Sequence, residues 1–329
     1  MVPETLNTEH SIFMENIRAA QAESQGMAEV LIEALPWIKQ ATGKIMVIKY
    51  GGAAMVDDQL CSDVMSDIVL MKLVGIKPVI VHGGGNDISD LSRRLGLPVE
   101  FKDGLRVSPP EVMTVVKMVL LGQVNQELVA QLNLHGHLAV GLNGADGMII
   151  QAQPLAADLG MVGDITAVDT TLLQDLIARD YIPVIASVAV GENGESYNVN
   201  ADLAAGHIAA ALGAHKLIFL TDVDGIYADF ADKRSLYYRL DLSVARQILD
   251  HGANSGMIPK IQAAIQAIEA GVPRAHILNG TIPHSLLLEL FTNEGVGTML
   301  TPDNGGDPSE GSNKPADLNN LARKLNLAD

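Results

Sequence analysis

Two short apolar runs each end in a cluster of glycines, a pattern that predicts binding of phosphate groups. The first run, residues 46–48, leads into Lys-Tyr-Gly-Gly at positions 49–52, and the second, residues 79–81, leads into His-Gly-Gly-Gly at positions 82–85. Both runs are typical of buried strands, and a helical pattern follows each glycine cluster. Because the N–H groups at a helix start attract anions, we expect two phosphate-handling loops in one domain.

The glycine spacing disfavours two common nucleotide-binding classes. Neither loop matches G-x-x-x-x-G-K-[ST], and the second lacks the last glycine of G-x-G-x-x-G, so neither a P-loop nucleoside triphosphatase nor a nicotinamide-dependent dehydrogenase is indicated. Lys49, at a strand end beside Gly51 and Gly52, could reach a phosphate held by the first loop; an ordinary surface lysine is the alternative. Gly84 and Gly85 have no side chains, so a ligand could approach their backbone closely.

Polar side chains gather at two further places along the chain. Asn198, Asn200 and Asp202 alternate before a helical run, and the two asparagines would face the same way as bonding groups for a polar ligand; a helix cap is the alternative. An apolar run also leads into Thr-Asp-Val-Asp-Gly at positions 221–225. Open α/β sheets bind ligands at such strand ends, so we expect this segment to lie near the same site.

Lys260 breaks a local rule in a way that indicates function. It follows Gly-Met-Ile-Pro at positions 256–259 and therefore lies at a predicted helix start. A positive charge there opposes the helix dipole, which is unfavourable unless an anion is near.

Composition limits the class of protein. The chain has 329 residues, 48% of them hydrophobic, and a net charge of -17, so it can bury a large core but lacks the basic surface that nucleic-acid binding requires. Its one cysteine, Cys61, fits a reducing compartment. No long apolar segment is free of charges, Gly or Pro, so we expect a cytoplasmic protein that binds neither nucleic acid nor membrane.

The elements that must position these residues form an α/β pattern. A helix over residues 60–74 separates the first two strands, which makes a β-α-β unit and therefore a parallel sheet. Ser108-Pro-Pro-Glu111 has the form of a capping box, so a helix should start there and end at Leu121. A further helix is predicted over residues 27–40. We expect more strands at 139–142, 182–185, 217–220 and 275–278, and two lobes that share one continuous sheet.

Taken together, the motifs resemble those of the N-acetyl-L-glutamate kinases, a branch of the amino-acid kinase family. The resemblance spans residues 27–300. No single motif is specific to the family, but seven motifs in the family's order make a specific match. The matching segments are Lys49–Gly52, Val81–Gly85, Gly104–Val107, Gly122–Asn125, Asn198–Asp202, Leu220–Gly225 and Gly256–Lys260.

The resemblance implies the fold and a division of the chain. The fold would be a three-layer sandwich with a mostly parallel central sheet. Residues 44–190 would form a lobe for the acid substrate and for dimerisation, and residues 191–300 a lobe for ATP. Residues 27–43 would be an oligomerisation helix, flanked by a mobile extension at 1–26, while 301–329 would be a disordered tail outside the family pattern.

The resemblance also implies the reaction, transfer of the γ-phosphoryl group of ATP to the side-chain carboxylate of N-acetyl-L-glutamate in arginine biosynthesis. Such a carboxylate is already ionised at pH 7, so no catalytic base is required. Mg²⁺ would be held by the phosphates rather than by a protein cage. The implied catalytic residues are Lys49, Lys260 and Asp202. The implied acid-binding residues are Gly84, Gly85, Arg106 and Asn198, and the nucleotide-binding ones are Gly51, Gly52, Asp222 and Gly225.

Regulation by arginine is a further implication. Arginine-inhibited members of the family carry an N-terminal helix that links dimers into a hexamer, and Leu-Pro-Trp-Ile at positions 35–38 resembles that helix. The arginine site would comprise Trp37, Lys216, His276, Glu289 and Gly295, with Glu289 pairing with the guanidinium. A nitrogen-signalling protein is a further possible partner.

Two departures and two alternatives remain open. Ser255 replaces a glycine that the family often has before the last motif, and the tail has no counterpart. One alternative is a sister kinase acting on another carboxylate or on carbamate. The other is a catalytically silent arginine sensor, which would not need both lysines and Asp202.

Overall fold

A single large sheet runs through the molecule. The structure, a computed structural model, describes residue 25 and residues 28–55, 57–250, 256–292 and 295–303. The sheet has eight strands in the order β12-β14-β13-β11-β1-β2-β8-β5. Their bounds are Ile45–Tyr50 for β1, Lys77–His82 for β2, Ala139–Asn143 for β5, Ile182–Ala186 for β8, Lys216–Thr221 for β11, Arg239–Asp241 for β12, Ala275–Asn279 for β13 and Thr298–Thr301 for β14.

Most of this sheet is parallel, as predicted. The strands from β13 to β5 all pair in parallel, and β1–α2–β2 is the expected β-α-β unit. All six strands predicted from apolar runs are present. β14 runs antiparallel to β13 and pairs in parallel with β12, so these two edge strands reverse the direction. The sequence analysis did not identify them.

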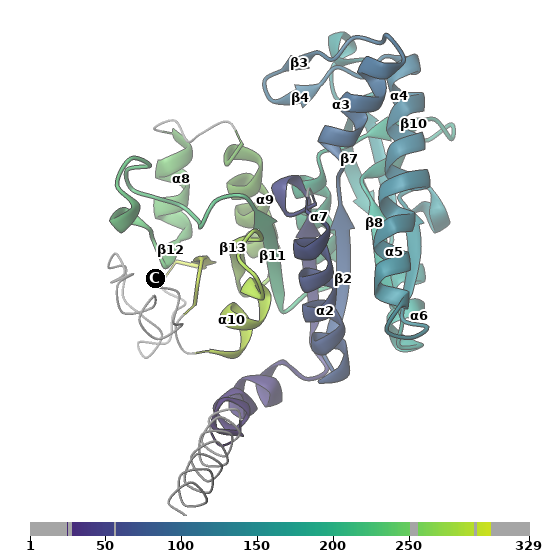
Figure 1. Cartoon of the computed structure of the whole chain (residues 1–329). Helices are drawn as coiled ribbons and strands as arrows, with labels where there is room; N and C mark the ends of the chain where they lie inside the picture. Colours follow the sequence, from purple (N-terminus) through teal and green to yellow (C-terminus); the bar gives the residue numbers. More distant parts are fainter. Residues whose placement is uncertain (1–24, 26–27, 56, 251–255, 293–294, 304–329) are drawn as a thin grey trace, which may run out of the picture.

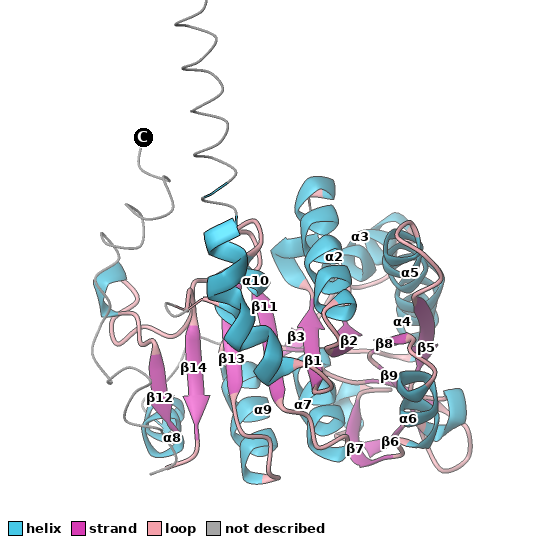
Figure 2. Cartoon of the chain, turned by 90° about the horizontal axis from the view of Figure 1, so that it is seen from below, coloured by secondary structure: helices cyan, strands magenta, loops and turns pink. Residues whose placement is uncertain are grey.

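Helices cover both faces of the sheet (Figure 2). Alternate residues of β1 enter two separate cores: Val47 packs with α7 and α9, whereas Met46 and Ile48 pack with α2 and α5. The predicted three-layer α/β sandwich is therefore confirmed. On the first face lie α6 (Thr171–Ala178), α7 (Ala201–Ala211), α8 (Leu242–Asp250) and α9 (Ile258–Glu269). On the second lie α2 (Asp58–Leu73), α3 (Gly85–Arg94), α4 (Pro110–Lys117), α5 (Asn125–Asn133) and α10 (Ser285–Phe291).

Two small sheets lie beside the large one. A four-stranded sheet has the order β10-β9-β6-β7, and β3 pairs with β4 as a hairpin that Figure 1 shows next to α3. Their bounds are Phe101–Lys102 for β3, Leu105–Arg106 for β4, Ile150–Pro154 for β6, Gly163–Val168 for β7, Val188–Val190 for β9 and Ser196–Asn198 for β10. Short 3-10 turns occur at Gly52–Met55, Asp146–Met148, Ala157–Leu159 and Lys233–Ser235.

The capping box predicted at Ser108 is wrong. The cap residue of α4 is Pro109, with no side-chain cap bond. The Ser108 hydroxyl instead donates to the Arg106 carbonyl at 2.9 Å and accepts from the Asn198 amide at 3.1 Å. The helix also does not end at Leu121, because a π-helical segment, Met118–Val124, connects α4 directly to α5.

The predicted N-terminal helix is present over residues 28–41 and projects away from the sheet in Figure 1. Thr301 ends β14, and Asp303 accepts a hydrogen bond from the Ser243 N–H. Residues 1–24 and 304–329, which make up most of the two predicted extensions, lie outside the described residues, as does Ser255. No helix among the described residues is long and apolar enough to cross a membrane. The division into lobes at residue 190 stays a prediction.

Candidate active site

The predicted catalytic, acid-binding and nucleotide-binding residues meet at the carboxyl edge of the parallel strands. β1 brings Lys49 to this edge, β2 leads into the glycines at 83–85, and β11 leads into the segment beginning at Asp222. Parallel strands end together, so segments distant in sequence become neighbours there. The two glycine loops lie together, because Gly51, Gly52 and the glycines at 83–85 line one cavity.

Two lysines share one buried aspartate at the centre of this edge. The Lys49 ammonium lies 3.0 Å from one carboxylate oxygen of Asp202, and the Lys260 ammonium lies 3.3 Å from the other. α7 presents Asp202 in its first turn, and α9, which packs on α7, presents Lys260 in its own first turn. We call Lys49, Asp202 and Lys260 the charged triad.

The charged triad carries one net positive charge in a strongly acidic protein. Burial by itself raises the pKa of Asp202, but the charges of Lys49 and Lys260 outweigh burial and lower that pKa. Asp202 is therefore ionised at neutral pH, and two ammonium groups face it. Such a group can attract an anion and orient it without a large change in structure.

A cavity of about 220 Å³ lies on one side of the triad; we call it the glycine-loop cavity. Arg106 and Asn198, both predicted to bind the acid, line it together with Gly84 and Gly85. One guanidinium nitrogen of Arg106, Nη2, donates to the Gly85 carbonyl and to Ser89, each at 2.7 Å. The other, Nη1, is buried without a partner among the described residues and is thus available for a negatively charged ligand.

Asn198 and Asn200 both line the glycine-loop cavity, but their side chains bond different partners. The Asn200 side-chain oxygen accepts from the N–H groups of Asp202 at 2.8 Å and Leu203 at 3.1 Å, so it caps α7. The alternative interpretation of a helix cap was correct for this residue. Asn198 bonds Ser108, which in turn bonds the Arg106 carbonyl, so its amide belongs to the wall that supports Arg106.

A larger cavity, of about 650 Å³, lies on the other side of the triad; we call it the large cavity. The predicted nucleotide residues Asp222 and Gly225 line it, and Lys260 reaches it from α9. Gly225 has φ +153°, and a Cβ there would lie 2.3 Å from the Thr298 hydroxyl oxygen. A side chain at this position would therefore displace β14 or the cavity wall.

The sequence analysis missed the aromatic wall of the large cavity. Tyr227, Phe230 and Tyr237 line it, although aromatic residues make up only 4% of the chain. Tyr227 and Phe230 meet edge to face at 5.8 Å between ring centroids. Their loop follows the Thr-Asp-Val-Asp-Gly motif directly, so clustering of aromatic residues after this motif was the available signal.

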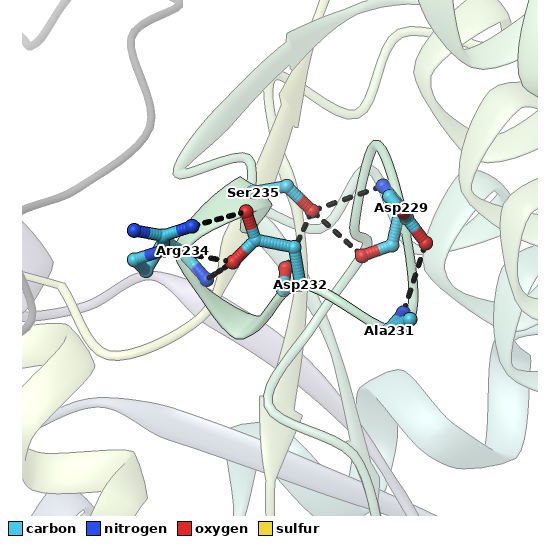
Figure 3. Close-up of polar contacts among 5 residues, drawn as sticks. All are labelled: Asp229, Ala231, Asp232, Arg234 and Ser235. Carbon is cyan, nitrogen blue, oxygen red and sulfur yellow. Dashed lines mark hydrogen bonds and ion pairs between the residues drawn. The ribbon is translucent and has the colours of Figure 1, made fainter.

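Polar contacts fix the loop that carries this wall (Figure 3). The Ala231 N–H donates to the Asp229 carboxylate at 2.9 Å, and the Ser235 hydroxyl donates to the Asp229 carbonyl at 2.8 Å. Arg234 donates from its Nε and Nη2 to the two oxygens of Asp232. The loop is therefore held by short-range bonds, which keeps the aromatic side chains over the cavity.

The predicted arginine-site residues lie at the opposite end of the sheet. Lys216 begins β11, whose other end, Thr221, lines the large cavity. His276 lies 2.7 Å from one oxygen of Glu289, and the other oxygen accepts from the Val296 N–H at 2.7 Å. A Cβ on Gly295 would lie 2.6 Å from Glu289.

Three of the five predicted arginine-site residues therefore form one cluster: His276, Glu289 and Gly295. Burial, and the positive charge of Lys216 next to it, lower the pKa of His276. Trp37 packs against the core of the second face from the N-terminal helix. No group of three His, Cys, Asp or Glu side chains in the described part of the chain is placed to hold a metal ion.

Comparison with known proteins connects this geometry to a family. The chain matches the model of the amino acid kinase family over residues 44–279. It is 51% identical over 287 residues to the acetylglutamate kinase of Bifidobacterium longum (strain DJO10A), covering 84% of this chain and 91% of that protein. It is 52% identical over 276 residues to the acetylglutamate kinase of Caldanaerobacter subterraneus subsp. tengcongensis, covering 83% and 92%.

A solved structure is also similar. N-acetylglutamate synthase from Neisseria gonorrhoeae, complexed with coenzyme A and N-acetyl-glutamate, superposes with a TM-score of 0.75 at 28% identity. The match covers 83% of this chain but 63% of the synthase, so this chain spans less than two thirds of that protein. The charged triad and both glycine loops lie within residues 44–279, the part of the chain that the family model matches.

Proposed function

The chain belongs to the amino acid kinase family, and from that premise we propose that it phosphorylates the side-chain carboxylate of N-acetyl-L-glutamate. ATP supplies the γ-phosphoryl group, and the products are N-acetyl-L-glutamyl 5-phosphate and ADP, in arginine biosynthesis. The observation that carries this proposal is the charged triad between two cavities. The smaller has a buried guanidinium nitrogen of Arg106 with no partner among the described residues, and the larger has an aromatic wall and room for a nucleotide.

The chemistry requires positive charge and orientation rather than a base. An ionised carboxylate must approach a phosphoryl group that is itself negatively charged, so the barrier is largely electrostatic. Lys49 and Lys260 would stabilise the transferring group from its two sides, and Asp202 would hold both ammonium groups in place. The N–H groups of the glycine loops would bind phosphate and substrate oxygens.

The large cavity would hold ATP, with Asp222 and Gly225 among the residues that contact it and Gly51 and Gly52 near its phosphates. Mg²⁺ would be bound chiefly by phosphate oxygens and water, because the buried carboxylate nearest to them, Asp202, already pairs with two ammonium groups. When bound, the ion neutralises phosphate charge.

ADP release with a panel of acceptors tests the proposal. The panel is N-acetyl-L-glutamate, glutamate, aspartate, and bicarbonate with ammonia. We expect turnover with N-acetyl-L-glutamate and little with the others. Turnover only with another acceptor would establish the sister-kinase alternative, and arginine binding without turnover of any acceptor would establish the sensor.

Arg106→Lys should raise the KM for the acid substrate by about tenfold while kcat changes little. Lysine keeps the charge but loses the planar fork that bonds Gly85, Ser89 and a carboxylate at once. Steady-state kinetics at saturating ATP measure both parameters. Arg93→Lys, on the exposed end of α3, is the matched control. An unchanged KM in Arg106→Lys would exclude the carboxylate clamp.

We further propose that arginine inhibits the enzyme by binding at the cluster of His276, Glu289 and Gly295, with Lys216 and Trp37 as further contacts. The cluster lies away from both cavities, as an inhibitor site distinct from the substrate sites requires. Since the Glu289 carboxylate already bonds His276 and Val296, the guanidinium would share or displace one of these bonds. Arginine titration at fixed substrate should abolish most activity, and full activity at millimolar arginine would refute the site.

We also propose that dimers assemble into hexamers through the N-terminal helix. Its apolar residues Val30, Leu31, Ile32 and Leu35 are each more than half exposed in the single chain. A double variant, Leu31→Asp with Leu35→Asp, should reduce the mass measured by light scattering to that of a dimer. Glu29→Ala with Glu33→Ala on the same helix is the control, and an unchanged mass in the aspartate variant would refute this interface.

We propose in addition that the protein is cytoplasmic and that a partner protein regulates it. A cytoplasmic protein fits the single cysteine of the chain. A nitrogen-signalling protein would be a further partner of the assembled ring.

A further inference from the structure

A buried histidine and asparagine lie directly behind the second glycine loop. His82 ends β2 with no exposed surface. Its Nδ1 is 3.0 Å from the Gly83 carbonyl oxygen, and its Nε2 is 2.9 Å from Nδ2 of Asn125. Neither side chain lines either cavity. These residues therefore do not touch a ligand, and any role in the reaction must pass through the loop.

The hydrogen bonds of Asn125 determine the protonation of the histidine ring. Asn125 Nδ2 lies 2.9 Å from the Val184 carbonyl oxygen, so the nitrogen rather than the oxygen of the amide must face it. The same nitrogen donates its second hydrogen to His82 Nε2. Nε2 is then an acceptor, and the proton of the neutral ring is on Nδ1, where it donates to Gly83. Burial lowers the pKa of His82 to about 4, which agrees with a neutral ring.

The bond to the Gly83 carbonyl orients the next N–H group. In a trans peptide the C=O and N–H point in opposite directions. Because the Gly83 carbonyl faces His82, the N–H of Gly84 faces away from the ring. Gly84 and Gly85 begin α3, so their N–H groups have no carbonyl acceptor within the helix, and both residues line the glycine-loop cavity.

The π-helical segment explains how Asn125 reaches this position. The Asn125 N–H bonds the carbonyl of Leu120, five residues back, so the two residues lie nearly one above the other on one helix face. Leu120 packs closely against the loop, since a Cβ on Gly84 would come within 2.7 Å of its side chain. Gly141 leaves space for the amide, because a Cβ there would lie 2.1 Å from the Asn125 oxygen.

We propose that His82 and Asn125 are a positioning pair that fixes the Gly83–Gly84 peptide so that the N–H groups of Gly84 and Gly85 face the transferring phosphoryl group and the acid substrate. The inference rests on the proposed function. It also assigns a role to Gly122–Asn125, a motif for which the charged triad and the cavities leave no task. Loss of the pair should lower kcat, while ATP binding in the large cavity stays intact.

Two partly isosteric variants separate positioning from stability. In His82→Asn the amide nitrogen takes the place of Nδ1 and can still donate to Gly83, but Asn125 loses its acceptor. In His82→Gln the amide oxygen takes the place of Nε2 and accepts from Asn125, but the donor to Gly83 is lost. Each variant therefore keeps one of the two hydrogen bonds of His82 and loses the other. The proposal predicts that the variant with the higher kcat is the one with the lower Tm.

We expect His82→Asn to keep kcat within about threefold of the native value despite a lower Tm. We expect His82→Gln to retain more stability yet lose at least about tenfold in kcat, with the KM for ATP unchanged. If kcat follows Tm in the two variants, or if His82→Gln keeps full activity, the positioning role is wrong.

Should either variant fail to fold, Asn125→Ala provides the second test. It removes the donor to His82 Nε2, so nothing keeps the ring proton on Nδ1, and the donor to the Gly83 carbonyl is no longer fixed. The proposal predicts a fall of about tenfold or more in kcat with an unchanged KM for ATP, and an unchanged kcat would overturn it. The native protein in the same assay distinguishes the two levels of inference. Lack of turnover with any acceptor would overturn the proposed function together with the pair, whereas an active native protein with a kcat that follows Tm would overturn only the pair.

Discussion

Lys260→Ala should lower kcat by about 100-fold or more, while the KM for each substrate should change little. The Lys260 ammonium lies between Asp202 and the large cavity, where charge would develop on the transferring phosphoryl group. A donor placed in advance is worth more in the transition state than in the ground state, so its loss appears in kcat. Steady-state kinetics with varied ATP and varied acid measure the two effects separately.

A lysine elsewhere on the protein provides the control for this experiment. Lys117→Ala, on the exposed face of α4, removes the same side chain at a position that lines neither cavity and should leave kcat unchanged. A Lys260→Ala variant with a raised KM and a native kcat would place this lysine in ground-state binding rather than in transfer.

Asp202→Asn has the second largest expected effect, because it alters the charged triad and the folded state together. The asparagine side chain keeps the shape of aspartate but carries no charge. The ammonium groups of Lys49 and Lys260 would then lie near each other without the negative charge that offsets their repulsion. We expect kcat to fall on the order of 100-fold. We also expect the free energy of unfolding at pH 7 to fall by about 3 kcal/mol, the typical cost of removing one partner from a buried ion pair.

The stability effect of Asp202→Asn should depend on pH in a defined direction. The lysines lower the pKa of Asp202 in the folded state, so the native protein gains stability at pH values above the pKa of the unfolded chain, about 3.9. That stability is lost as the pH falls through the lower, folded-state pKa. Urea unfolding of the two proteins between pH 7 and about pH 2 measures the difference.

The difference in unfolding free energy between native protein and Asp202→Asn should be constant from pH 7 to about pH 5 and then decrease. Asp90→Asn, on the exposed face of α3, is the matched control and should show a much smaller difference over the whole range. A difference that grows as the pH falls would contradict an ionised Asp202 in the folded state.

Local patterns predicted the parallel part of the sheet correctly. The six apolar runs correspond to β1, β2, β5, β8, β11 and β13. A short run rich in β-branched apolar residues is typical of a buried strand, so the local sequence is enough to predict it. The edge strands β12 and β14 were missed. They are short and gain their order from pairing with each other and with β13, which no local pattern records.

The errors at Ser108 and Asn200 have the same physical origin. Each is a residue whose side chain can bond either a helix end or a distant partner. Asn200 caps its helix, whereas Ser108 does not, because Asn198 and the Arg106 carbonyl occupy its hydroxyl. The local sequence allowed a helix cap at both positions. Ser108 does not cap its helix because its hydroxyl bonds Asn198, which is 90 residues away.

The sequence by itself determined the class of chemistry: two glycine loops at strand ends and a set of motifs in order indicate phosphate transfer to an acid. These signals are local, since a strand end, a glycine turn and a helix start each need only a few residues. The tertiary structure alone decided which charges meet. Asp202 and Lys260 are 58 residues apart, and their ion pair forms only because helices pack on the sheet. The same packing buries the Nη1 nitrogen of Arg106, which has no partner among the described residues, and brings His82 against Asn125. Packing fixes such contacts through the sum of many weak, non-directional interactions, which no short stretch of sequence carries.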